Sequence, residues 1–262
     1  MRVGVFDSGL GGLSIAQAIA RRMPDLDLLY LGDTMRVPYG GRSQAAIHGF
    51  VAEALTYLFE QDCHLVVLAC NTASAEALRR SQQEYLPRWY PDRRVLGVVI
   101  PAAEAVAATG ARRIGVLATR STAASGAFER EIARQAPEAE VRVLAAPLLV
   151  PLVENGGLKY VDAVLDDYLA ELGEVDAIVL GCTHYGLLRE RIRARVAVPV
   201  IVQEEVVPDR LEDYLGRHPE HASKLGRSGE RIYRVTDLGP GYEELARTFA
   251  GQDVRLEKVA IC

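Results

Sequence analysis

The stretch that decides the fold is Val66-Val67-Leu68-Ala69-Cys70, an apolar run that ends in a cysteine. It is echoed 112 positions later (66 to 178) by Ile178-Val179-Leu180-Gly181-Cys182. A second pair, Arg2-Val3-Gly4-Val5-Phe6 and Arg113-Ile114-Gly115-Val116-Leu117, is offset by 111 positions (2 to 113). Two repeats in register predict two similar halves, each with a cysteine at the end of an equivalent strand.

Short Val/Ile/Leu-rich runs alternate with helical patterns along the chain, which is typical of parallel βα units. We therefore predict an α/β fold of two pseudo-symmetric, doubly wound domains with largely parallel sheets. The active site is expected in the cleft between them, at the carboxyl ends of the strands. The predicted strands are Arg2–Phe6, Leu28–Leu31, Leu65–Ala69, Val95–Ile100, Arg113–Ala118, Val141–Leu144, Ala177–Leu180 and Val198–Val202.

The chain after about Gln203 does not continue the second half. Its Pro, Gly and charge content rises first, and a strand pattern at Ile232–Val235 and a helix pattern at Gly241–Phe249 follow. We expect this tail to pack back on the first half. The first domain is then discontinuous, residues 1–97 plus 206–262, and the second domain is residues 98–205.

Composition excludes several classes of protein. The 262 residues are 49% apolar and 25% charged with a net charge of -5, and the basic residues are scattered, which argues against a nucleic-acid partner. The N-terminus lacks a signal-peptide pattern, and no run reaches the roughly 20 apolar residues of a membrane helix. We expect a cytoplasmic protein whose four cysteines are thiols. The absence of a CxxC motif or Cys/His ligand cluster argues against a metal site.

The glycine-rich loop Asp7–Gly12 follows the first strand and invites a nucleotide-binding interpretation. A dinucleotide fingerprint needs a third glycine where Ser14 stands, and Asp7 would bring negative charge near a pyrophosphate. The loop suits a small anionic substrate better, because glycines let backbone N–H groups approach a ligand and a helix N-terminus attracts a carboxylate.

The two cysteine loops carry the chemistry. Each cysteine precedes a predicted helix, whose N-terminus would lower the pKa of a thiol from about 8.5 toward neutrality. Neighbouring hydrogen-bonding residues could hold a carboxylate and an ammonium; they are Asn71, Thr72, Thr183 and His184. Buried free cysteines are often only small hydrophobic residues. A matched pair with polar neighbours favours function, because inverting an α-carbon requires a base on one face and an acid on the other.

Other polar loop residues are weaker candidates. Asp7 and His184 are titratable, although a turn residue and a buried structural histidine are equally good interpretations. Ser43 is expected to cap the helix formed by residues 43–61, while Tyr39 and Gly40 could reach a ligand through a hydroxyl and a backbone amide. Glu154 is an acidic loop residue of the kind that is usually just solvated.

Four blocks resemble the signatures of the bacterial glutamate racemases, members of the aspartate/glutamate racemase family, in the same order and at similar spacing. They are residues 6–12, 38–40, 69–75 and 180–185. Residues 118–122 and 150–154 also resemble family segments. The likeness runs from about Val3 to Val202 and returns more weakly over Tyr233–Val259.

The resemblance implies a cofactor-independent enzyme that interconverts L- and D-glutamate and supplies D-glutamate for peptidoglycan, often as a homodimer. It makes Cys70 and Cys182 the acid/base pair, with Cys182 acting on L-glutamate and Cys70 on D-glutamate. Asp7 would assist Cys70, and His184 and Glu154 would assist Cys182. Substrate contacts would come from Asp7, Ser8, Tyr39, Gly40, Asn71, Thr72, Thr119, Thr122, Thr183 and His184.

The sequence departs from the family pattern at three places. Gly186 stands where proline usually follows His-Tyr, Phe128 replaces a frequent tyrosine, and Gln203–Pro208 lacks the common Asp-Ser motif. Two other functions stay open. One is a racemase of aspartate or another small dicarboxylate, since pocket length is not visible in the sequence. The other is a non-catalytic regulator that keeps a glutamate site.

Overall fold

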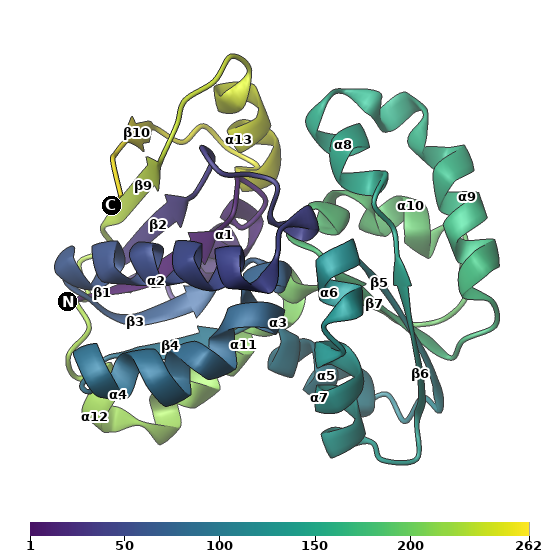
Figure 1. The fold of residues 1–262 in the computed structure, drawn as a ribbon, viewed down its shortest axis with the longest axis horizontal. Coiled ribbons are helices and arrows are strands. Elements are labelled where there is room, and N and C mark those ends of the chain that lie inside the picture. Colours follow the sequence, from purple (N-terminus) through teal and green to yellow (C-terminus); the bar gives the residue numbers. More distant parts are fainter. Residues whose placement is uncertain (262) are drawn as a thin grey trace.

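A computed structural model describes residues 1–261 and contains two sheets in which every strand pair is parallel (Figure 1). The larger sheet has the order β10-β9-β2-β1-β3-β4 and the smaller has the order β6-β5-β7-β8. The strands are β1 (Arg2–Asp7), β2 (Leu28–Gly32), β3 (Cys63–Leu68), β4 (Arg94–Gly97), β5 (Arg113–Ala118), β6 (Glu140–Ala145), β7 (Ala177–Gly181), β8 (Val200–Ile201), β9 (Arg231–Val235) and β10 (Leu256–Lys258). The predicted fold class is confirmed.

The internal repeat is visible in strand order and register. The run β2-β1-β3-β4 corresponds to β6-β5-β7-β8, with β1 and β5 as the equivalent central strands. Gly4 pairs with Val66 in the larger sheet, and Gly115 pairs with Ile178 in the smaller one. These are the residues that the offsets of 111 and 112 match. The repeat therefore places the ends of β3 and β7 at equivalent positions.

Helices cover both sheets (Figure 1). They are α1 (Leu13–Arg22), α2 (Gln44–Glu60), α3 (Asn71–Arg80), α4 (Leu86–Trp89), α5 (Val99–Ala107), α6 (Arg120–Ala124), α7 (Ala127–Gln135), α8 (Leu149–Glu154), α9 (Val161–Leu172), α10 (Arg189–Arg193), α11 (Gln203–Arg217), α12 (Pro219–Ala222) and α13 (Tyr242–Ala250). Helix α2 begins as predicted, because Ser43 Oγ accepts a hydrogen bond from the Ala46 N–H at 3.3 Å.

The sequence interpretation was wrong at several element boundaries. Strand β4 ends at Gly97, and the apolar residues Val99 and Ile100 begin α5 instead, because a short apolar run suits a buried helix as well as a strand. Only Val200–Ile201 of the predicted last strand is paired. Helix α11, which contains Pro208, and strand β10 were not predicted.

The tail packs back on the first half, as expected. Strand β9 pairs with β2, β10 pairs with β9, and α11 packs against α1, where Arg22 Nε lies 2.8 Å from Asp209 Oδ1. Strands before residue 98 and after residue 230 thus share one sheet. The domain boundaries themselves, at residues 97/98 and 205/206, stay a prediction.

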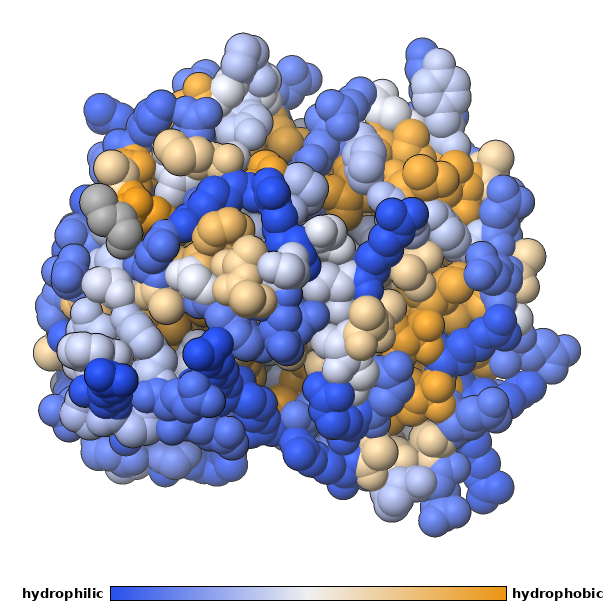
Figure 2. Space-filling view, in the orientation of Figure 1, coloured by the Kyte–Doolittle hydropathy of each residue, from blue (hydrophilic) through white to orange (hydrophobic). Residues whose placement is uncertain are grey.

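The surface of the two halves differs in character. Figure 2 shows apolar residues gathered mainly over the half that holds the smaller sheet, while the other half is largely hydrophilic from this side. Single large apolar side chains are nevertheless exposed on both halves, for example Leu148 and Tyr160 on the smaller-sheet half and Met35 and Trp89 on the other. None of the helices within residues 1–261 has the length and apolar character needed to cross a bilayer.

Candidate active site

The two repeated cysteines line one cavity between the sheets. Cys70 follows β3 and Cys182 follows β7, at the carboxyl ends of equivalent strands. Their exposures are only 6% and 7%, and both border a cavity of about 210 Å³. The repeat thus brings two thiols from opposite halves of the molecule to the same small space, which is what chemistry on two faces of one carbon requires.

Most of the predicted site residues lie in the wall of this cavity. The predicted residues in the lining are Ser8, Tyr39, Gly40, Cys70, Asn71, Thr72, Thr119, Glu154, Cys182, Thr183 and His184. Asp7 and Thr122 are fully buried behind that wall. The lining residues that were not predicted include Arg120, whose side chain is exposed, and the apolar Val150 and Pro151 of the second half.

Cys70 is held at the first turn of α3. The backbone N–H of Ala73 donates to its sulfur at 3.4 Å, and its thiol donates to Ser8 Oγ at 3.3 Å. Burial raises the pKa of Cys70 to about 12, and the negative charge of Asp7 adds to the effect. The predicted lowering of this pKa by the helix N-terminus is therefore wrong, because desolvation of the thiolate outweighs the helix.

Asp7 is a buried carboxyl group beside the Cys70 loop. Its Oδ2 accepts a hydrogen bond from the Gly9 N–H at 3.1 Å, while Oδ1 has no hydrogen-bond partner among the residues that the structure describes. Burial raises the pKa of Asp7, although the charge of His184 and the backbone N–H groups of Gly12 and Gly9 oppose that shift. A carboxyl group in this setting is suited to exchange a proton with a neighbour.

His184 lies between Cys182 and Glu154 and contacts both. His184 Nδ1 lies 3.9 Å from Cys182 Sγ, and His184 Nε2 lies 2.8 Å from Glu154 Oε1. Burial opposes a charge on this ring, but the hydrogen bonds to Cys182 and Glu154 prevail and raise the pKa of His184 to about 10. His184 is therefore an imidazolium at neutral pH, and its Nδ1 faces both the Cys182 sulfur and the closer Thr183 Oγ1, at 3.3 Å.

The glycine loop 7–12 brings the two halves into close contact next to the cavity. Only Ser8 of this loop lines the cavity. A Cβ at Gly11 would lie 2.4 Å from Thr183 Oγ1 and 2.9 Å from His184 Nδ1, so the glycine lets the Cys182 loop approach closely. The expectation that backbone N–H groups of this loop meet a ligand stays a prediction.

Tyr39 is fixed by residues that the sequence did not point to. Its hydroxyl donates to Asp33 Oδ2, and Thr236 from the C-terminal tail donates to Asp33 Oδ1 at 2.9 Å. The predicted contact of the Tyr39 hydroxyl with a ligand thus competes with an internal partner. The ring still forms part of the cavity wall. No local pattern links residues 39 and 236, so only the fold brings them together.

Three threonine hydroxyls connect the two halves next to the cavity. Thr72 Oγ1 lies 3.0 Å from Thr119 Oγ1 and 3.2 Å from Thr122 Oγ1. Thr119 and Thr122 are themselves 3.0 Å apart. Thr122 therefore supports the lining residues Thr72 and Thr119 from behind, and any direct contact of Thr122 with a ligand stays a prediction.

Comparison with known proteins decides the family. Residues 13–204 match the family described as Asp/Glu/Hydantoin racemase. The chain belongs to this racemase family. A glutamate racemase of Roseobacter denitrificans is 39% identical over 236 residues, which is 84% of this chain and 87% of the relative. One of Aquifex aeolicus is 38% identical over 97% of this chain and 96% of the relative. The resemblance seen in the four sequence blocks is confirmed.

Solved racemase structures share the whole fold. The crystal structure of glutamate racemase from Francisella tularensis in complex with D-glutamate has a TM-score of 0.89 and 29% sequence identity. The match covers 99% of this chain and 97% of that chain. The similarity therefore includes both sheets.

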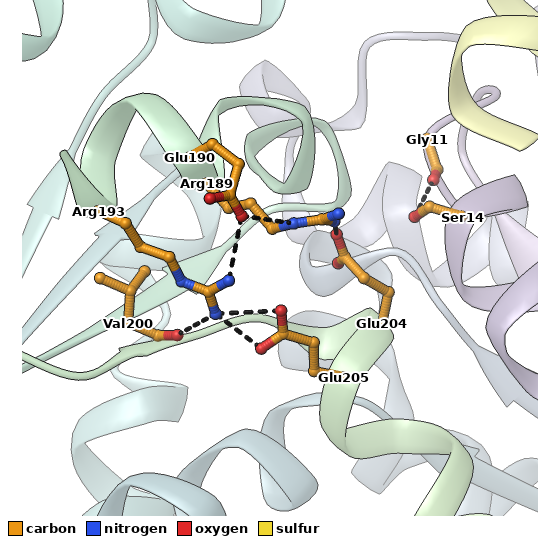
Figure 3. A network of polar contacts seen from close by, with 8 residues as sticks. All are labelled: Gly11, Ser14, Arg189, Glu190, Arg193, Val200, Glu204 and Glu205. Atoms are coloured by element: carbon orange, nitrogen blue, oxygen red, sulfur yellow. Dashed lines mark hydrogen bonds and ion pairs between the residues drawn. The ribbon is translucent and has the colours of Figure 1, made fainter. Parts of the chain in front are cut away.

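Two places where this racemase departs from the family pattern, Gly186 and the segment Gln203–Pro208, lie next to each other in the fold. A Cβ at Gly186 would lie 2.3 Å from Glu204 Oε1, so glycine leaves room for a carboxylate at the start of α11. Figure 3 shows that carboxylate paired with Arg189, whose Nη1 is 2.9 Å from Glu204 Oε1. The same network pairs Arg193 with Glu205 at 2.8 Å. Glycine at position 186 thus leaves room for the Arg189–Glu204 ion pair.

Gln203, the first residue of α11, contacts the loop that holds Cys70. Gln203 is 1% exposed, and its Nε2 donates to Asn71 Oδ1 at 3.0 Å. Asn71 Nδ2 has no hydrogen-bond partner among the described residues, although Asn71 lines the cavity. Gln203 therefore fixes the amide so that a donor remains free. It was missed because residues 71 and 203 are joined only in the fold.

Proposed function

We propose that this chain interconverts L- and D-glutamate without a cofactor, with Cys70 and Cys182 as the two acid/base residues. The observation that carries the proposal is the presence of both sulfurs, from equivalent strand ends, at one small cavity. The glutamate racemases to which the chain is similar, one of them solved with D-glutamate, support the choice of substrate.

The proposed reaction needs one thiolate and one thiol. The thiolate takes the α-hydrogen as a proton, so the C–H bond breaks, an S–H bond forms and the electron pair spreads into the substrate carboxylate. The opposite thiol then gives its proton to the other face of Cα and is left as a thiolate. We assign removal of the proton from L-glutamate to Cys182 and from D-glutamate to Cys70.

The supporting residues differ on the two sides. On the Cys182 side, the imidazolium of His184 can donate to the sulfur while Glu154 holds the ring, given the 3.9 Å and 2.8 Å contacts. On the Cys70 side, Asp7 is the buried carboxyl that can exchange a proton with the reacting groups. Each side thus has its own acid/base partner.

The polar lining suits an amino acid with two carboxylates. We assign the α-carboxylate and ammonium contacts to Ser8, Asn71, Thr72 and Thr183, with the free Asn71 Nδ2 as a donor. Asp7, Tyr39, Gly40, Thr119, Thr122 and His184 complete the predicted set. Arg120, at the exposed part of the lining, adds positive charge that attracts a dicarboxylate.

Solvent exchange tests the proposal. The dialysed protein, without added cofactor, is incubated in D₂O with either enantiomer of glutamate, and NMR follows loss of the α-proton while polarimetry follows racemisation. We expect exchange and racemisation from both enantiomers. If aspartate is turned over faster than glutamate, aspartate is the substrate and the choice of glutamate is wrong. If neither amino acid exchanges its α-proton, the proposal is overturned and the regulator alternative is supported.

The wider setting follows from this function. We propose that the product D-glutamate enters peptidoglycan, that the enzyme works in the cytoplasm and that it forms a homodimer. We also propose that the chain divides into a discontinuous first domain, residues 1–97 plus 206–262, and a second domain, residues 98–205. Sedimentation of the purified protein would test the dimer directly.

Replacing Gln203 tests the positioning of Asn71. We expect Gln203→Leu to raise KM for glutamate about fivefold, the effect of one hydrogen bond worth about 1 kcal/mol, while kcat changes less. The reason is that Asn71 Oδ1 loses its donor and the amide no longer holds one orientation. Steady-state kinetics in both directions measures the change. Glu205→Gln, two residues along the same helix, is the matched control and should leave KM unchanged; a KM in Gln203→Leu equal to that control contradicts the assignment.

A further inference from the structure

Three histidines gather at the end of β3 opposite to Cys70. His64 is the second residue of β3 and is 1% exposed, whereas His218 directly precedes α12 and His221 lies within it. In Figure 1, α12 lies on the side of the larger-sheet half that is away from the smaller sheet. His64 Nε2 lies 3.0 Å from His221 Nδ1. None of these residues belongs to the cavity between the sheets. The cluster therefore has no part in the proposed reaction.

The outer part of this cluster has the composition of a metal site. One ligand atom from each of His218, Glu220 and His221 lies within 4.8 Å of the others. Glu220 Oε1 is 3.1 Å from His218 Nδ1 and 3.7 Å from His221 Nε2. Ligand atoms in a tetrahedral zinc site are about 3.3 Å apart, given bonds of about 2.0 Å. Small side-chain rotations would bring all three atoms onto one ion.

The rings are already held in place. Tyr214 packs beside both rings, with its ring centroid 4.4 Å from that of His218 and 6.2 Å from that of His221, whose own centroids are 5.9 Å apart. Coordination through His221 Nε2 selects the tautomer whose Nδ1–H donates to His64 Nε2. Zinc-bound histidines commonly make such a second hydrogen bond, which orients the ring. His64 thus supplies the outer support that an accidental surface cluster lacks.

We propose that His218, Glu220 and His221 bind a divalent transition-metal ion, Zn²⁺ in the first place. Two imidazoles and one carboxylate suit zinc, whereas Mg²⁺ and Ca²⁺ prefer oxygen ligands. His218 and Glu220 are partly exposed, at 39% and 60%, so solvent can supply a fourth ligand. Arg94 and Lys224 lie near His221, so the Glu220 carboxylate is needed to offset their charge.

The bound ion would fasten the C-terminal segment to the first sheet. His218 follows the last residue of α11 and His221 contacts His64 of β3, so a metal on His221 stiffens a link between parts of the chain 157 residues apart. The function of the site is then structural. The three proposed ligands lie together within residues 218–221, but this segment has no cysteine and forms no CxxC or Cys/His motif. The proposal therefore departs from the expectation of no metal site.

Co²⁺ and Zn²⁺ binding to the full chain tests the proposal. We expect one Co²⁺ per chain with visible absorption but without the near-ultraviolet band of a thiolate ligand, and a rise in Tm of about 5 °C at a Zn²⁺ concentration one hundred times Kd. The double variant His218→Ala/Glu220→Gln should lose both effects. Mg²⁺ at the same concentration should produce neither.

The catalytic thiols could also bind zinc, so the matched control is Cys70→Ser/Cys182→Ser. This variant should keep the Co²⁺ spectrum and the Zn²⁺-dependent rise in Tm. Loss of binding in the cysteine variant, a thiolate band in the wild type, or unchanged binding in His218→Ala/Glu220→Gln would each overturn the proposal. Since His218 and Glu220 are partly exposed, their replacement should leave the fold intact, which circular dichroism can verify.

Discussion

Replacing either Cys70 or Cys182 by alanine is expected to lower the rate of glutamate racemisation at least about 1,000-fold, because each variant lacks the acid or base on one face of Cα. Polarimetry with each enantiomer measures the loss. Both side chains are small and border a cavity, so the fold should persist. The two variants should lose racemisation equally, since inversion needs both sulfurs in every turnover.

Exchange with solvent separates the roles of the two sulfurs. Cys182→Ala retains Cys70 and should still exchange the α-proton of D-glutamate slowly, while Cys70→Ala should do so only with L-glutamate. Cys63→Ala is the matched control: Cys63 is buried in the same strand that leads to Cys70, yet it lies outside the cavity. Full racemase activity in either catalytic variant contradicts the two-base assignment.

The sequence predicted the fold best where a structural element follows from the residues of one short segment. The apolar runs ending in Cys70 and Cys182 predicted the strands, and the offsets of 111 and 112 predicted their equivalent positions. Polar residues directly after those strands had to reach the cavity, since the carboxyl ends of parallel strands meet at one edge. Most of the cavity lining was therefore predictable from the loops.

The remaining features depend on contacts between distant segments. Gln203 and Asn71, or Asp33 and Thr236, become partners only when the tail returns to the first sheet. The pKa of Cys70 likewise could not be predicted from the sequence. A helix N-terminus can be identified in the sequence, but the burial that raises the pKa of the Cys70 thiol cannot be identified there, because burial depends on how the two halves assemble.

Replacing His184 by asparagine is expected to lower kcat/KM about 100-fold, because Cys182 loses the group that can donate to its sulfur. The equilibrium constant between two enantiomers is one, so kcat/KM must fall equally in both directions even though His184 contacts only one of the sulfurs. The separate kcat and KM values for L- and D-glutamate need not change together. Steady-state kinetics with both enantiomers checks this, and an unchanged kcat/KM contradicts the role of His184.

The dependence of kcat/KM on pH is expected to follow the ionisation of His184. Below about pH 10 His184 carries its proton and can donate to Cys182; as the pH rises through about 10 the proton leaves, and kcat/KM should fall. Glu154 is one of the groups that raise this pKa. In Glu154→Gln the fall should therefore begin at a lower pH. Glu171→Gln, which removes an exposed carboxylate on α9, is the charge-matched control and should keep the wild-type profile. If the pH profile of Glu154→Gln coincides with that of this control, the His184–Glu154 contact does not govern the ionisation of His184. Removing the carboxylate would then have left the imidazolium as stable as before.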